Sequence, residues 1–215
     1  MTTAAQRDPR IMKNTFLKDV ENHEMDVILD DGGVIRCIHF HPKDKVLGAY
    51  YFTLTTWPNH LCISGDMGTY VFSRELDMFA FFDDTRIKRK DGFFVNFDYW
   101  AEKIVSVSRF EGEVNIFNWK ETIKELTEEL NLSKEKAEEL KDLEYPGNAH
   151  LAVHLLEETL DGCAYVPDHV VYSPSFHTQW CMNAILWGIS EYKKHRVVQE
   201  KHDYGTIKAS HTEIY

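Results

Sequence analysis

The stretch YYFTLTTWPNHLCISGDMGTYVFS, residues 50–73, decides the fold class. It holds three runs of β-branched and aromatic residues, which are separated by turn signals at Pro58-Asn59 and at Gly65–Gly68. These runs predict strands over 50–57, 60–64 and 69–73. Because a parallel crossover needs a much longer connection, we expect the three strands to be antiparallel neighbours.

The residues before this stretch predict a hairpin and a helix. Met25–Leu29 and Val34–Phe40 flank Asp30–Gly33, in which an Asp-Gly pair is typical of a hairpin turn. Further upstream, apolar residues at helical spacing predict a helix over 9–22. The first half therefore predicts an antiparallel meander.

Helical patterns dominate after residue 76. We expect helices over 76–82, 99–105, 114–130, 133–143, 148–160 and 176–199. The last of these is apolar on almost all sides around Trp180–Ile189, so we expect it in the centre of the core, with Trp180 and Trp187 buried. Strands followed by helices predict an α+β fold, in which an N-terminal antiparallel sheet packs against a helical C-terminal half with a buried long terminal helix.

Composition favours one folded domain over the 215 residues. Hydrophobic residues make up 43% of the chain, which excludes a disordered protein. We interpret 1–215 as a single domain, sheet-rich over about 23–75 and helix-rich over about 76–202. No run is apolar for the roughly 18 residues of a membrane span, and the N-terminus lacks the apolar run of a signal peptide, so we expect a cytoplasmic protein.

The net charge of −11 argues against general binding to nucleic acids, which needs clustered Lys and Arg. The excess is concentrated in Glu111–Glu144, where eleven acidic residues face five basic ones, a net charge of −6. Two interpretations stay open. The segment is either a solvated helical surface, or a polyanion mimic that covers a basic nucleic-acid channel on a partner protein. The candidate residues for the mimic are Glu125, Glu128, Glu135 and Glu139.

The hairpin expected around Gly65–Gly68 is a candidate contact site for a ligand or partner. A turn of this kind exposes backbone N–H groups and an acidic side chain at its tip. The candidate contact residues are Trp57, His60, Asp66, Met67 and Arg74. Alternatively, the two glycines only serve the turn, and Asp66 bonds the neighbouring backbone.

Catalytic and metal-binding patterns are sparse. His39 and His41 share one face of a predicted strand, and His60 or Asp66 could supply a third metal ligand. The chain has no G-x-S-x-G, G-x-G-x-x-G or Walker motif, and its four cysteines show no C-x-x-C spacing. We therefore predict no catalytic residue and no cofactor, with the three histidines as the weak alternative.

The chain resembles a widespread family of uncharacterised tailed-phage and prophage proteins. The resemblance is strongest in Phe52–Arg74, whose centre reads HLCISGDMGTY. It continues in shorter segments further along the chain. Those segments are Asp77–Phe82, Tyr99–Lys103, Trp180-Cys181, Ala184, Trp187–Ile189 and Tyr192. The sequence departs from the family in its Lys/Glu-rich helices and in the basic insert Arg86–Lys90. The resemblance implies a context, the infected bacterium, but no mechanism.

In that context we expect a phage accessory protein that antagonises a bacterial defence system. It would act in the host bacterial cytoplasm by occupying the surface of a host protein or complex, without direct contact to nucleic acid or membrane. One alternative is a small metal-dependent or nucleotide-modifying enzyme built on His39, His41, His60 and Asp66. Another is a sponge for a nucleotide signal, with Arg74 and Lys88 or Arg89 as its positive groups. A structural or regulatory phage protein also stays open.

Overall fold

The computed structural model describes residues 9–44, 48–83, 95–108, 114–162 and 165–212. The chain divides into two compact units: unit 1 comprises Met1–Val114 and Phe176–Tyr215, and unit 2 comprises Asn115–Ser175. Each unit has its own cluster of buried apolar side chains. In unit 2 the helices after residue 118 bury their apolar faces against one another.

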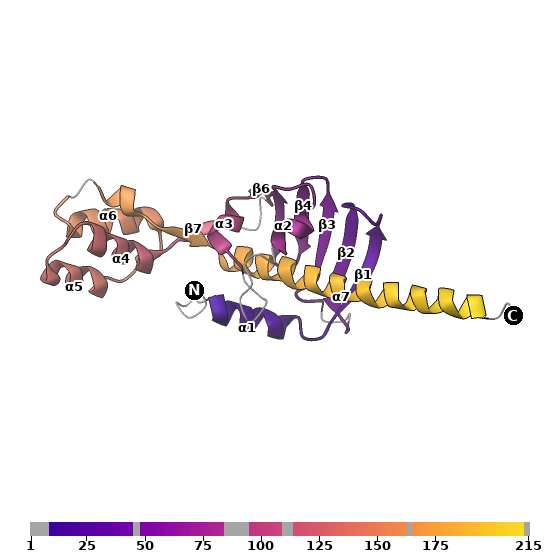
Figure 1. The fold of residues 1–215 in the computed structure, drawn as a ribbon. Coiled ribbons are helices and arrows are strands. Elements are labelled where there is room, and N and C mark those ends of the chain that lie inside the picture. Colours follow the sequence, from indigo (N-terminus) through magenta and orange to yellow (C-terminus); the bar gives the residue numbers. More distant parts are fainter. Residues whose placement is uncertain (1–8, 45–47, 84–94, 109–113, 163–164, 213–215) are drawn as a thin grey trace. The chain divides into compact units, whose positions relative to one another are not determined.

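Unit 1 contains a six-stranded antiparallel sheet in the order β1-β2-β3-β4-β5-β6 (Figure 1). Each strand pairs with its neighbour in sequence, and the register aligns His39 with Thr53, and Thr53 with Ser64. The antiparallel sheet and the helical second half confirm the predicted α+β fold. The strands are β1 (His23–Asp30), β2 (Arg36–Pro42), β3 (Phe52–Trp57), β4 (His60–Gly65), β5 (Gly68–Ser73) and β6 (Ile104–Val107).

The sixth strand corrects the helix predicted over 99–105. A short helix, α3 (Phe97–Ala101), begins after Asn96, whose side-chain oxygen accepts a hydrogen bond from the backbone N–H of Tyr99. The chain then turns, and β6 pairs with β5 so that Val107 lies opposite Tyr70. The β-branched residues after 103 suit a strand, and the otherwise unpaired edge of β5 gives that strand its hydrogen-bond partners.

Helices cover one face of the sheet. The buried face is lined by large apolar side chains, among them Phe40, Leu54 and Ile63, and the long helix α7 (Phe176–Thr212) crosses it (Figure 1). Trp180, on α7, is fully buried, as predicted, whereas Trp187 is only partly buried. Two further helices, α1 (Pro9–Asp19) and α2 (Met78–Phe82), also contact α7.

A polar network ties the edge of the sheet to α7. The Arg36 guanidinium donates two hydrogen bonds to the Asp77 carboxylate, at 2.9 and 3.1 Å. The Asp30 carboxylate accepts hydrogen bonds from the Tyr192 hydroxyl at 2.5 Å and from Arg196 at 2.9 Å. Burial raises the pKa of Asp30, but these bonds and one from the Gly32 N–H outweigh it and leave the pKa below its ordinary value. The Asp30 contacts therefore hold α7 against β1, and the Arg36–Asp77 pair holds the start of α2 against β2.

His23, at the start of β1, should make the stability of unit 1 depend on pH. Its Nε2 lies 3.0 Å from the Tyr50 carbonyl oxygen, which can only accept a hydrogen bond, so Nε2 carries a proton. Burial lowers the pKa of His23 below 6.5, and this effect outweighs the opposing effect of that carbonyl. The unfolded chain therefore binds the second proton at a higher pH than the folded one does.

We expect the free energy of unfolding to fall as the pH falls through 6.5 toward the lowered value. Part of this loss should be absent from His23→Gln, whose amide can still donate to the Tyr50 carbonyl. Urea unfolding of both proteins above and below this window measures the effect. Equal pH slopes for the two proteins would contradict it.

Unit 2 is a small helical unit closed by a two-stranded ribbon. The ribbon pairs β7 (Asn115–Phe117) with β8 (Tyr172–Pro174), and a short 3-10 helix, η2 (Val166–His169), precedes β8. The three helices are α4 (Trp119–Glu129), α5 (Lys134–Asp142) and α6 (Ala149–Thr159). The buried core of the unit consists of Ile123, Leu126, Leu140, Leu156, Leu160 and Val166.

The start of α4 corrects the helix predicted over 114–130. Asn118 caps α4 by accepting a hydrogen bond from the Glu121 N–H, and it donates another to Ser173 at 2.8 Å. The three residues before it pair with β8, so they are extended. The helices predicted over 133–143 and 148–160 are confirmed, with Ser133 and Asn148 as their N-caps.

Candidate functional site

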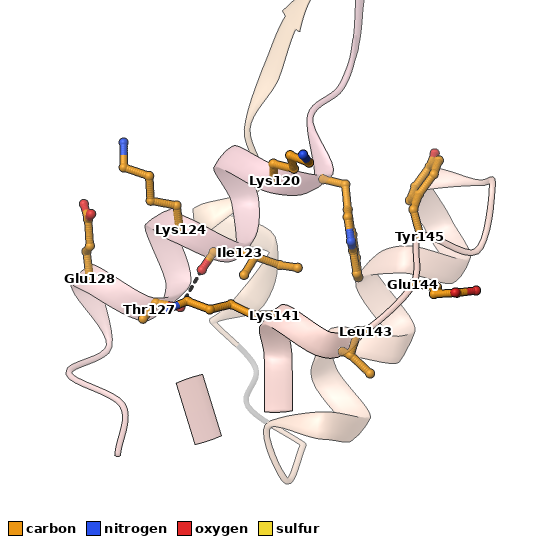
Figure 2. Close-up of a pocket in the computed structure, with 10 residues that line it drawn as sticks. Lys120, Ile123, Lys124, Thr127, Glu128, Lys141, Leu143, Glu144 and Tyr145 are labelled. Carbon is orange, nitrogen blue, oxygen red and sulfur yellow. Dashed lines mark hydrogen bonds between the residues drawn. The ribbon is translucent and has the colours of Figure 1, made fainter. Parts of the chain in front are cut away.

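A large and mostly apolar groove lies on unit 2. Its volume is about 500 Å³, which lies in the usual range for ligand sites of roughly 300–1,000 Å³. It lies between α4 and the segment that follows α5 (Figure 2). Its lining residues are Trp119, Lys120, Ile123, Lys124, Thr127, Glu128, Lys141, Leu143, Glu144 and Tyr145.

Helix α4 forms one wall of the groove. Trp119, Ile123 and Thr127 follow one another at four-residue spacing, so they share a face of the helix. The Thr127 hydroxyl donates to the Ile123 carbonyl at 2.7 Å, which leaves its methyl group available to the groove. These three side chains make this wall of the groove largely apolar.

The end of α5 forms the opposite wall. Leu143 has extended backbone angles that stop the helix, and the chain continues past Glu144 to Tyr145. The Tyr145 ring packs on Trp119, with centroids 5.7 Å apart, and stacks on Phe117 at 5.8 Å. Tyr145 is nevertheless 42% exposed. The aromatic wall is thus fixed by its neighbours and still open to a ligand.

Positive charge gathers at the rim of this groove. Lys124 is held by Glu121, with Nζ 3.3 Å from a carboxylate oxygen, and this contact raises the pKa of Lys124. Lys120 and Lys141 make no ion pair with any residue that the structure describes. Figure 2 shows these two lysines on either side of Ile123, with Glu128 and Glu144 toward opposite ends of the groove.

The four glutamates proposed as a polyanion mimic are all exposed on unit 2. Glu125 and Glu128 lie on α4, and Glu135 and Glu139 lie on α5. Lysines are interspersed among them, and Lys136 forms an ion pair with Glu139 at 3.0 Å. Of the four, only Glu128 lines the groove.

The hairpin at Gly65–Gly68 uses its residues mainly for structure. The Asp66 carboxylate accepts a hydrogen bond from the Tyr50 backbone N–H at 3.0 Å. Met67 is only 9% exposed and belongs to the core of unit 1, so its side chain does not extend from the tip as a contact. The Met67 side chain packs against the apolar core of unit 1, because burial there removes it from water.

Two other residues of this candidate site are brought together. The rings of Trp57 and His60 stack with centroids 5.1 Å apart and planes 9° from parallel. Arg74 is exposed, and its backbone N–H donates to the Asn59 carbonyl. The other positive groups suggested for nucleotide binding, Lys88 and Arg89, lie outside the described residues.

The three histidines do not form one metal site. His39 and His41 do lie on one face, with ring centroids 5.2 Å apart, beside a cavity of about 270 Å³. His41 Nε2 lies 3.0 Å from an Asp26 carboxylate oxygen. His60, however, stacks on Trp57 at the other end of the sheet. No cluster of three or more His, Cys, Asp or Glu side chains with metal-binding geometry occurs among the described residues.

The sequence pattern did not reveal the groove, because its residues are far apart and individually ordinary. Trp119 packs in part against the core of unit 2 and also lines the groove. Tyr145 lies in a Pro-Gly segment between two helices. The signal that the sequence does carry is the four-residue spacing of Trp119, Ile123 and Thr127.

Comparison of the chain with protein-family models, with curated proteins and with solved structures finds no match. The relation to tailed-phage proteins therefore stays a prediction from sequence. None of the helices that the structure describes has both the length and the apolarity needed to cross a bilayer.

Proposed function

We propose that the protein is a binding antagonist that occupies the surface of another protein, and that the groove of unit 2 is its main contact. The observation that supports this proposal is the groove itself, whose aromatic wall is ordered by packing and is still accessible. Partly exposed Trp and Tyr side chains in a concave site are typical anchors of protein interfaces. In the context that the resemblance implies, the partner is a defence protein of the infected bacterium.

The test is a plating assay in bacteria that each carry one defence system. The protein is expressed from a titratable promoter, and the plating efficiency of a phage sensitive to that system is measured. We expect plating to recover in one strain, in proportion to the amount of protein, because an antagonist acts stoichiometrically. Full recovery at amounts far below those of the target would indicate turnover and contradict a binding mechanism. No recovery in any strain would contradict the anti-defence role.

Reversing the acidic residues separates the groove from the polyanion mimic. Glu125, Glu135 and Glu139 are exposed and lie outside the groove, so their joint replacement by lysine tests charge alone. We expect the free energy of unfolding to change by about 1 kcal/mol or less, since exposed ion pairs contribute little. We also expect antagonism in the plating assay to persist. Its loss in a folded variant would favour the mimic and contradict the groove as the main contact.

A further inference from the structure

The lysines of unit 2 are concentrated at its groove. From Asn115 to Ser175 the chain has thirteen acidic and five basic residues, a net charge of −8 with neutral histidine. Three of these five lysines, Lys120, Lys124 and Lys141, line the groove. Unit 2 is strongly acidic, yet three of its five lysines lie at a mostly apolar groove.

Two of these ammonium groups are available to a ligand. Lys124 shares its charge with Glu121 and lies near Glu128, whereas Lys120 and Lys141 have no ion-pair partner among the described residues. They come from different helices and lie on either side of Ile123 (Figure 2). Both lysines are exposed, so their ammonium groups are hydrated until an anion replaces the water.

The groove surface between Lys120 and Lys141 is apolar, so it favours an apolar group in its occupant. Trp119, Ile123, Leu143 and Tyr145 form this surface, and covering it removes apolar area from water. An occupant that also satisfies the two lysines must carry anionic groups beside its apolar group, and in an unmodified protein segment those are carboxylates. The lining holds three ammonium groups and two carboxylates, and those carboxylates, of Glu128 and Glu144, lie toward opposite ends of the groove. The charge beside Ile123 is therefore positive and favours an anionic occupant over a basic one.

We propose that the groove binds an acidic amphipathic segment of the partner protein. An apolar side chain of that segment lies against Trp119 and Ile123, and carboxylates on either side of it bind Lys120 and Lys141. Amphipathic helices bind apolar grooves in this way, and charges at the rim select among them. The proposal rests on the proposed function, because it names the chemistry of the surface that the antagonist occupies.

Three labelled helical peptides test it, with identical Leu and Trp stripes and with Glu, Gln or Lys at all outward positions. Fluorescence anisotropy gives their affinities for the full chain. Since the protein has a net charge of −11, nonspecific attraction favours the Lys peptide, and only a local site can reverse that order. We expect the Glu peptide to bind most tightly, by about fivefold over the Gln peptide for each lysine engaged, the upper limit for an exposed ion pair.

Variants of the lining residues test whether the groove causes the tighter binding of the Glu peptide. Lys120→Gln with Lys141→Gln should make the Glu and Gln peptides bind equally, whereas Lys134→Gln, on α5 but outside the groove, should change nothing. Trp119→Ala or Tyr145→Ala should weaken both peptides. Equal binding of the Glu and Gln peptides to the wild type, tighter binding of the Lys peptide, or no binding of any peptide would overturn the inference. The plating assay decides the proposed function independently of these outcomes.

Discussion

Replacement of Trp180 by alanine is expected to lower the free energy of unfolding by about 3–5 kcal/mol, the range for truncation of a buried aromatic side chain. Trp180 is fully buried, and its ring makes edge contacts with Phe16 at 5.1 Å and Phe52 at 5.8 Å. Its indole N–H also donates to the Asp19 carboxylate at 2.9 Å. Truncation would leave a cavity where α1, α7 and the sheet meet, together with an Asp19 carboxylate that has lost a donor.

Urea unfolding of Trp180→Ala and of Trp57→Ala measures this effect. Trp57 is 36% exposed and stacks on His60, so its truncation should change the free energy of unfolding much less. If the two variants were equally stable, α7 could not be the central helix of unit 1.

Gly65→Ala should destabilise unit 1 by about 3 kcal/mol, at the upper end of the range for overpacking. A Cβ at this position would lie 2.2 Å from the Tyr51 carbonyl oxygen and 2.7 Å from the Phe52 Cα. Both are backbone atoms, one in the first residue of β3 and one in the residue before it, so no side chain can move aside. The Tyr51 carbonyl is also fixed, because it accepts a hydrogen bond from the Asp66 N–H at 3.0 Å.

Gly33→Ala is the matched control for this substitution. Its Cβ would lie 3.2 Å from a carboxylate oxygen of Asp31, an exposed side chain held by the Gly33 and Ile35 N–H groups, so only a small adjustment of that side chain is needed. We expect this variant to unfold near the wild-type temperature and Gly65→Ala to unfold well below it. Similar unfolding temperatures for Gly65→Ala and the wild type would show that β3 and β4 are not as close as the structure places them.

Local patterns predicted most of the fold. Turn residues and β-branched runs determine the first five strands, and the caps Ser133 and Asn148 mark two helices of unit 2. The predictions are wrong in segments whose secondary structure depends on pairing with a strand elsewhere in the fold. The segment after Lys103 has residues compatible with either a helix or a strand, and it becomes β6 because the edge of β5 is free to pair. Likewise, Asn115–Phe117 is extended because β8 pairs with it, from more than 50 residues away.

The candidate site was less predictable than the fold. The sequence named Trp57 and His60 as separate candidate contacts, which the structure stacks on each other, and it predicted the acidic helix over 133–143 correctly. The groove depends instead on how α4 lies against the end of α5, which brings Trp119 to Tyr145. No pattern within either segment encodes that juxtaposition, because it is set by the packing of Leu126, Leu140 and Leu156 in the core of unit 2.

The most direct test of the account compares two partly exposed tryptophans in the plating assay. Trp119 lines the groove of unit 2, and Trp57 lies on the sheet of unit 1, where the sequence also suggested a contact site. Circular dichroism melting of each alanine variant first establishes that its helices and sheet are intact. We predict that Trp119→Ala abolishes antagonism of the host defence while Trp57→Ala retains it. Full activity of a folded Trp119→Ala variant, with loss of activity in Trp57→Ala, would contradict the account and assign the contact to the sheet.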